Sequence, residues 1–160
     1  MAVQHAFSRR LWLASLAMMG SGFGLGGRIG SVAASDGRAA ISQPDSPVPQ
    51  AFMARAYAMR DEAERAGDQS FGAVIVQDGR IVGQAPSRVV TRGDPTAHAE
   101  MEAIRDAAAR LTRRDLGGSV IYSSSRPCAM CEAAAYWAGI TRMIHGPSLT
   151  DGGPPRLGRC

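Results

Sequence analysis

The sequence predicts a domain of the α/β class, because patterns typical of helices alternate with patterns typical of buried strands between residues 51 and 150. Residues 51–66 carry apolar side chains at helical spacing, residues 71–76 form a nearly continuous apolar run, and residues 97–111 are rich in alanine. A chain of 160 residues, 45% of them apolar, has room for one such globular domain.

The first element is expected to be a helix over residues 51–66. Its apolar side chains recur three or four positions apart, at Phe52, Ala56, Met59 and Ala63. Charged residues separate them, and Gly67 follows where a C-cap is expected. The helix is therefore predicted to pack one face against the sheet.

Two antiparallel strands are expected next. The run from Phe71 to Val76 suits a strand buried on both faces. Asp78-Gly79 is typical of two-residue hairpin turns, and it leads into a second strand from Ile81 to Gln84. The two segments are therefore predicted to pair as a hairpin.

A helix, a strand, a helix and a strand complete the predicted order. They cover residues 97–111, 120–123, 127–138 and 141–145. Pro127 suits the first position of its helix. Thirty residues separate His98 from Cys128, which is room for one helix, one strand and the start of a second helix. Two helix starts are therefore expected side by side at one end of the sheet.

These two helix starts carry candidate metal ligands. His98 and Glu100 are expected in the first turn of one helix, and Cys128 and Cys131 in the opening turn of the next. A neutral imidazole and two thiolates give zinc an incomplete tetrahedral shell, so that water can take the fourth position and be activated. Glu100, two residues after His98, is then placed to carry protons rather than to bind metal.

Each motif alone is ambiguous. A Cys-x-x-Cys pair also occurs as a redox pair, as half of a structural zinc site, or as a pair of small buried residues. The prediction of a Zn²⁺ ion held by His98, Cys128 and Cys131 therefore depends on the two motifs together.

The pair of motifs resembles a known signature. His98-Ala99-Glu100 with Pro127-Cys128-Ala129-Met130-Cys131 matches the pattern of zinc-dependent nucleobase deaminases. The segment from Asp94 to Arg105 is similar to the D-P-T-A-H-A-E-x-x-A-I-R run of guanine deaminases and tRNA adenosine deaminases. Over about residues 51–150, the chain is thereby identified by resemblance as a member of the cytidine/deoxycytidylate deaminase superfamily.

The resemblance implies a three-layer α/β/α sandwich with a mixed sheet, in agreement with the predicted element order. It also implies a hydrolase of C–N bonds in cyclic amidines that deaminates a free nucleobase or nucleoside of the guanine or cytosine type. Zinc-activated water would be the nucleophile, with Glu100 as the proton shuttle. Substrate contacts are expected from Ser87, Ala97 and Trp137, with plain surface packing as the open alternative for the Trp137 ring.

The chain departs from the family pattern in three places. Ser87 stands where family members commonly carry a substrate-contacting Asn, and Arg126 stands where a Glu usually precedes Pro-Cys. After His145 only fifteen residues remain, whereas relatives usually continue with another helix and strand. The domain is therefore expected to be short at its C-terminus, and an inactive zinc-binding remnant of the fold stays open as an alternative.

Residues 1–34 are expected to be a twin-arginine signal peptide. Residues 8–13 (Ser-Arg-Arg-Leu-Trp-Leu) resemble the export motif, and the apolar stretch over 11–27 is too short and weak for a stable membrane span. Cleavage is expected after Ala34. Export to the periplasm or the cell exterior follows; the alternatives are an uncleaved helical anchor or a downstream start codon, which would make the protein cytoplasmic.

Residues 35–50, rich in Pro, Ser and Asp, are expected to be a disordered linker, and residues 151–160 a short tail rich in Gly and Pro. The domain between them is expected to cover residues 51–150.

The charge distribution bears on the partner. The net charge is +4, but residues 35–160 carry 15 Arg against 14 acidic residues, a formal charge of +1. Proteins that bind nucleic acid normally carry a basic excess, so a small-molecule substrate is expected and nucleic acid is not. A tRNA adenosine deaminase stays as the alternative function. The resemblance also implies a homodimer, because exposed strand edges favour pairing.

Overall fold

A computed structural model of the chain describes residues 38–157, so the predicted signal peptide lies outside the described residues. The helices are α1 (Pro49–Arg65), α2 (Val89–Arg92), α3 (Ala99–Arg110) and α4 (Ala129–Trp137). The strands are β1 (Gly72–Gln77), β2 (Arg80–Pro86), β3 (Val120–Ser123), β4 (Arg142–His145) and β5 (Thr150–Gly153). Within the described range, no helix combines the length and apolar character that crossing a bilayer requires.

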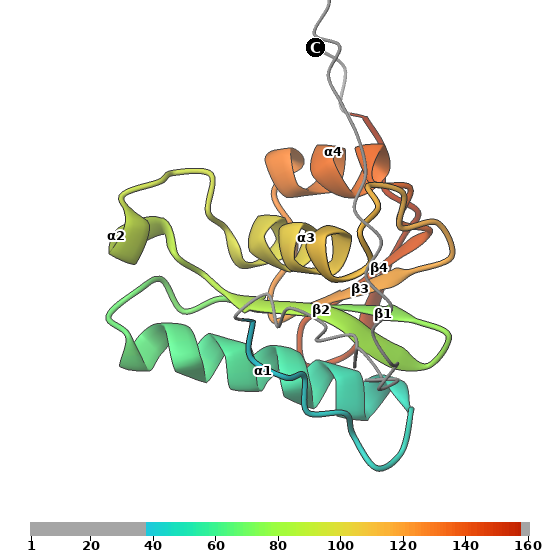
Figure 1. Cartoon of the computed structure of the whole chain (residues 1–160), viewed down its shortest axis with the longest axis horizontal. Helices are drawn as coiled ribbons and strands as arrows, with labels where there is room; N and C mark the ends of the chain where they lie inside the picture. The colour runs from blue at the N-terminus through green and yellow to red at the C-terminus, as the bar shows by residue number, and fades with distance from the viewer. Residues whose placement is uncertain (1–37, 158–160) are drawn as a thin grey trace, which may run out of the picture. The chain divides into compact units, whose positions relative to one another are not determined.

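The five strands form one sheet in the order β2-β1-β3-β4-β5. Strands β3 and β4 are parallel, and the other neighbouring pairs are antiparallel. Helix α1 covers one face of the sheet, and α3 and α4 cover the other (Figure 1). The predicted three-layer α/β/α sandwich with a mixed sheet is confirmed.

Alternate residues of β1 belong to two different cores, as expected for a strand buried on both faces. Val74 and Val76 join a core with Phe52 of α1. Ala73 and Ile75 point the opposite way, into a core to which α3 and α4 contribute buried alanines. Because these helices present small side chains, they can lie close to the sheet.

The predicted hairpin is confirmed. Strands β1 and β2 pair antiparallel, with Gln77 opposite Arg80. The two turn residues, Asp78 and Gly79, have φ values of 50° and 72°. Positive φ at both positions is the requirement of a type I′ turn, which Asp-Gly sequences meet well.

Gly72 sets the distance between the sheet and α1, and its replacement is predicted to be strongly destabilising. A Cβ atom at this position would lie 2.2 Å from both Ala56 O and Arg60 N, which are helix backbone atoms that cannot move aside. We expect Gly72→Ala to lower the free energy of unfolding by about 3 kcal/mol, measured by urea denaturation, because one of two packed elements must shift. Gly67→Ala is the matched control, because a side chain at this position meets no other atom, although φ is 73°. We therefore expect this variant to lose only about 1 kcal/mol of the free energy of unfolding, from backbone strain alone. Equal losses in the two variants would contradict this explanation.

The structure differs from the linker prediction over residues 38–50. Residues 49 and 50 already belong to α1. The Gln43 side chain forms two hydrogen bonds with the Ile81 backbone, both of 2.8 Å, one to its carbonyl and one from its N–H. Arg110 donates to Ala39 O at 2.7 Å. The segment is therefore attached to the domain by polar contacts, which a composition rich in Pro and Ser does not reveal.

The structure also differs from the tail prediction. Residues 150–153 form β5, which pairs antiparallel with β4 at the sheet edge, with His145 opposite Thr150. Thr-Asp-Gly-Gly lacks the apolar alternation of a predicted strand. Its pairing depends on backbone hydrogen bonds that β4 offers. The short helix α2 was likewise not predicted, and it lies in the segment between β2 and α3.

Candidate metal centre

Three predicted ligand atoms lie together at the starts of α3 and α4. His98 Nδ1 lies 3.7 Å from Cys128 Sγ and 3.6 Å from Cys131 Sγ, and the two sulfur atoms are 3.7 Å apart. This is the one cluster of three or more metal-ligating side chains found among residues 38–157. The sequence prediction that these residues meet is confirmed.

The separations fit a zinc ion. With tetrahedral bonds of about 2.3 Å to sulfur and about 2.0 Å to nitrogen, two sulfurs lie about 3.8 Å apart and a sulfur and a nitrogen about 3.5 Å apart. The distances in this structure agree with both values within about 0.2 Å. The three side chains therefore fit Zn²⁺ as they stand and leave a fourth tetrahedral position for another ligand.

Both helices begin two residues later than predicted, at Ala99 and Ala129 instead of residues 97 and 127, so the ligands stand closer to the helix ends. His98 is the N-cap of α3, and Cys128 is the N-cap of α4, both with extended backbone. Asp94 explains the later start of α3, because its side chain accepts hydrogen bonds from the N–H and hydroxyl of Thr96, at 2.8 and 2.7 Å. The Thr96 N–H is thus bonded within a turn, and the helix begins after it. Only Cys131 and Glu100 lie within first turns.

The electrostatics of the pocket favour a bound cation. Burial raises the pKa of the Cys131 thiol far above its usual range, and the nearby Glu100 carboxylate and Cys128 raise it further. A thiolate at this place therefore needs a positive charge, which a metal ion supplies. The N–H groups at the start of α4 point to the same region and also favour thiolates.

Glu100 lies beside the metal ligands and is 4% exposed. Its Oε1 accepts a hydrogen bond from Ser123 Oγ at 2.7 Å, and its Oε2 lies 3.5 Å from Cys131 Sγ. One carboxylate oxygen is thus held by the sheet, while the other faces the metal site. A carboxylate in this position can carry a proton between a water and a substrate.

Sequence reasoning missed Ser123. It is the last residue of β3 and is fully buried, and its hydroxyl orients the Glu100 carboxylate. A small polar residue ending an otherwise apolar strand is a weak signal, because such residues also end strands for turn formation. Only the sheet order, which sets β3 beneath the start of α3, reveals the contact.

Two of the predicted substrate-contacting residues lie in the segment between β2 and α3. The Ser87 side chain is buried, and its hydroxyl donates to Asp68 Oδ1 at 2.9 Å. Ala97 is also buried and directly precedes His98, and its carbonyl accepts a hydrogen bond from the Arg88 N–H at 2.9 Å. The hydroxyl of Ser87 therefore has a partner within the chain, and the substrate contacts of both residues stay predictions.

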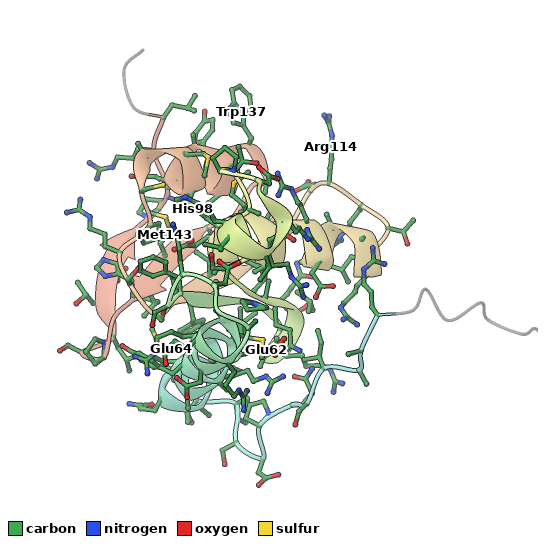
Figure 2. All side chains as sticks on the ribbon, turned by 90° about the vertical axis from the view of Figure 1, so that its left-hand side faces the viewer. Glu62, Glu64, His98, Arg114, Trp137 and Met143 are labelled. Atoms are coloured by element: carbon green, nitrogen blue, oxygen red, sulfur yellow. The ribbon has the colours of Figure 1, made fainter. Side chains whose placement is uncertain are left out.

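The third predicted contact, Trp137, is not brought together with the metal ligands. It is the last residue of α4 and is 74% exposed. Its ring projects outward, away from His98 (Figure 2), and meets Tyr136 edge-on at 5.5 Å. Stacking of this ring on a base therefore stays a prediction, because in a single chain the ring does not face the metal ligands.

Arg126, one of the departures from the family pattern, is exposed and lies next to the site. With Pro127, which directly precedes Cys128, it lines a cavity of about 280 Å³. Side chains of Glu132 and His145 contribute to the same cavity, as does Asp151 from β5. The missed strand β5 therefore forms one wall of a space adjoining the metal centre.

Asp68 fixes the segment that leads toward His98, and we expect its contribution to stability to depend on pH. Burial acts to raise the pKa of Asp68, but hydrogen bonds from the Thr91 N–H, the Gln69 N–H and the Thr91 and Ser87 hydroxyls outweigh it and hold that pKa well below the ordinary 3.8. A lowered folded-state pKa stabilises the protein above the unfolded pKa, and the contribution decreases as pH falls below it.

Urea denaturation of the wild type and Asp68→Asn at several pH values tests this expectation. The stability difference between them should be largest near neutral pH and should decrease below about pH 4, where the unfolded carboxylate takes up a proton. Asp78→Asn, in the hairpin turn, controls for the general effect of removing one negative charge. A difference that stays constant down to low pH would rule out the hydrogen-bonded carboxylate as its source.

The chain is similar to proteins of known family. The family model described as the cytidine and deoxycytidylate deaminase zinc-binding region matches residues 47–146. The chain is 41% identical over 103 residues to guanine deaminase of Bacillus subtilis, covering 64% of this chain and 66% of that protein. The crystal structure of that deaminase superimposes with a TM-score of 0.60 and 40% identity, covering 62% of this chain and 64% of the other.

Two further relatives differ in their named substrates. The chain is 39% identical over 98 residues to a probable cytosine deaminase of Schizosaccharomyces pombe, covering 61% of this chain and 59% of that protein. It is 37% identical over 98 residues to a tRNA-specific adenosine deaminase of Haemophilus influenzae, covering 61% and 57%. The chain thus spans roughly three-fifths to two-thirds of the length of these relatives, and similarity alone does not separate the substrates.

Proposed function

Because the chain belongs to the cytidine and deoxycytidylate deaminase zinc-binding family, we propose that it is a zinc-dependent hydrolytic deaminase of a free nucleobase or nucleoside. A base of the guanine type is the first candidate and one of the cytosine type the second. The observation that carries the proposal is the set of His98, Cys128 and Cys131 at tetrahedral spacing with Glu100 beside it.

His98 Nδ1 and the sulfurs of Cys128 and Cys131 would hold the metal. When bound, zinc supplies Lewis-acid activation of a water for attack on the ring carbon that carries the amino group. Overall, one water is consumed, a C–O bond forms, the C–N bond breaks, and ammonia leaves.

Glu100 would move the protons. Ser123 holds Oε1, so Oε2 is the oxygen available to accept a proton from the attacking water. The carboxyl group would pass this proton to the ring nitrogen, then take the second proton from the newly added hydroxyl and deliver it to the departing amine, which leaves as ammonia. Because Glu100 is buried, its carboxylate is shielded from bulk water and can deliver the proton to the substrate.

Ammonia release from guanine, adenine, cytosine and their nucleosides tests the proposal. Purified protein with one zinc per chain should turn over one or two of these compounds. An RNA stem-loop carrying an adenosine in the anticodon position belongs in the same panel. Zinc binding without turnover of any compound would overturn the proposal and favour an inactive remnant of the fold.

A tRNA adenosine deaminase is the second candidate function. The similarity to the Haemophilus influenzae protein supports it, and so does the shared run from Asp94 to Arg105. The formal charge of +1 over residues 35–160 weighs against it, because RNA binding normally requires a basic surface. Inosine formation in the stem-loop, with no ammonia from free bases, would establish this function instead.

Substrate contacts by Ser87, Ala97 and Trp137 are part of the proposal, and so is a homodimer. Trp137→Ala should raise KM for a purine if its ring, 74% exposed in one chain, is covered by substrate or by a partner subunit. Sedimentation of the purified protein measures the assembly directly. A monomer at working concentration, with an unchanged KM for Trp137→Ala, would contradict both parts.

Export is proposed from residues 1–34, which lie outside the described residues. Arg9 and Arg10 form the twin-arginine pair. Replacing both with Lys should leave the uncleaved precursor in the cytoplasm, as seen by cell fractionation. Identical fractionation of the variant and the wild type would favour a cytoplasmic protein with a downstream start.

A further inference from the structure

A second cavity, whose lining includes none of the metal ligands, lies where the end of β2 and helix α2 meet α3. Its volume is about 310 Å³. Six charged side chains line it: Arg38, Arg88, Arg92, Arg105, Glu102 and Asp106. We call it the arginine cavity. None of these six side chains belongs to the metal centre described above.

The lining of the arginine cavity carries a positive excess. Four guanidinium groups face two carboxylates, which leaves a formal charge of +2. The whole of residues 35–160 has a formal charge of only +1, so this local excess is not a consequence of a generally basic chain. It is a concentration of arginine at one place.

The two carboxylates already have partners. Glu102, whose side chain is 7% exposed, accepts hydrogen bonds from Arg92 on one oxygen and from Arg105 on the other, the latter at 2.6 Å. Asp106 Oδ2 accepts from Arg110 and from the Gln84 N–H, at 2.8 and 3.1 Å, and Oδ1 pairs with Arg38 at 3.5 Å. All four carboxylate oxygens already contact an arginine side chain, so this cavity is not suited to bind a cation.

Three of the guanidinium groups, those of Arg88, Arg92 and Arg105, keep donors that these contacts do not use. A guanidinium presents several N–H groups in a rigid fork. Within residues 38–157, the Arg92 contact uses one terminal nitrogen, and its side chain remains 51% exposed. Arg105 remains 48% exposed. The Arg88 side chain has no hydrogen-bond or ion-pair partner among those residues. The cavity therefore offers surplus donors and surplus positive charge.

We propose that the arginine cavity binds a phosphate group. A phosphate monoester carries up to two negative charges, which matches the excess of the lining, and it has three or more acceptor oxygens for several guanidinium donors at once. Glu102 holds Arg92 and Arg105 in place before the ligand arrives, which lowers the entropy lost on binding. The phosphate can belong to inorganic phosphate, to a nucleotide or to a nucleic-acid backbone.

Titration calorimetry of the full-length chain with three probes distinguishes these sources: inorganic phosphate, guanosine 5′-monophosphate and a short single-stranded RNA. Sodium chloride at matched ionic strength is the reference. Binding of the first two identifies a site for a small phosphate compound, whereas binding of RNA alone identifies a contact to a phosphate backbone. Both results support the phosphate site, and no binding of any probe beyond the salt reference overturns it.

Arg88→Gln and Arg88→Glu test the location, because the Arg88 side chain has no partner within residues 38–157 whose loss would disturb folding. We expect Arg88→Gln to weaken binding by about tenfold, the effect of one charge-assisted hydrogen bond, and Arg88→Glu to weaken it further. Arg114→Gln is the matched control, since Arg114 points into solvent on another part of the surface (Figure 2). Equal affinity of the Arg88 variants and the control would overturn the proposal. These experiments measure binding affinity and not deaminase activity, so failure of the phosphate site can be distinguished from failure of the proposed function.

Discussion

Glu100→Gln is expected to lower the deamination rate by about 10² to 10⁴-fold, because a positioned proton-transfer group contributes this much, while zinc stays bound. Glutamine has the size of glutamate and can still accept the hydrogen bond from Ser123 Oγ. It cannot take up and return a proton. The loss should therefore appear in kcat at saturating substrate, measured as ammonia release, with the zinc content unchanged.

Glu62→Gln is the matched control for this loss. Glu62 lies on α1, on the opposite side of the sheet from His98 (Figure 2), so the same chemical change there should leave the rate unaltered. If Glu100→Gln kept most of its activity, Glu100 would not be the proton carrier. If it lost zinc together with activity, Glu100 would serve the metal centre rather than the chemistry.

The metal ligands are the part of the site that the sequence predicts, because the chemistry of metal binding allows only a few residue types at these positions. A zinc ion with an open position requires ligands of few kinds, so His98, Cys128 and Cys131 are recognisable from spacing and residue type alone. The β1–β2 hairpin is predictable for a similar reason, because positive φ at Asp78 and Gly79 limits the residues that a type I′ turn accepts.

The rest depends on contacts between distant segments. Ser123 holds Glu100 only because β3 lies beneath α3, and Gln43 pairs with Ile81 across 38 positions of the chain. Strand β5 has no apolar pattern and forms because β4 offers an unpaired edge. The arginine cavity brings together β2, α2 and α3, and no pattern along the chain marks residues so far apart as neighbours.

Cys131→Ser is expected to remove zinc from the protein and to abolish turnover with it. Cys131 is the buried ligand, 1% exposed, and its sulfur lies 3.6 Å from His98 Nδ1 and 3.7 Å from Cys128 Sγ. A hydroxyl does not ionise at neutral pH, so the metal would lose one of three protein ligands. Changes to groups that merely orient a ligand cost about 10 to 100-fold in affinity, and loss of the ligand itself should cost more. Zinc content after dialysis against a chelator measures the effect.

The same variant should also unfold more readily than the wild type in the presence of zinc. At a free zinc concentration 100 times the Kd, binding adds about 2.7 kcal/mol to the free energy of unfolding, and a variant that does not bind loses this amount. Removing zinc from the wild type with a chelator should produce the same shift of Tm, whereas Cys131→Ser should not respond to the chelator.

Cys160→Ser provides the control for the third cysteine of the chain, and it should retain zinc, activity and the chelator response. If Cys160→Ser lost zinc as Cys131→Ser does, the ligand set would be wrong; if neither did, the tetrahedral spacing at the helix starts would not be a zinc site.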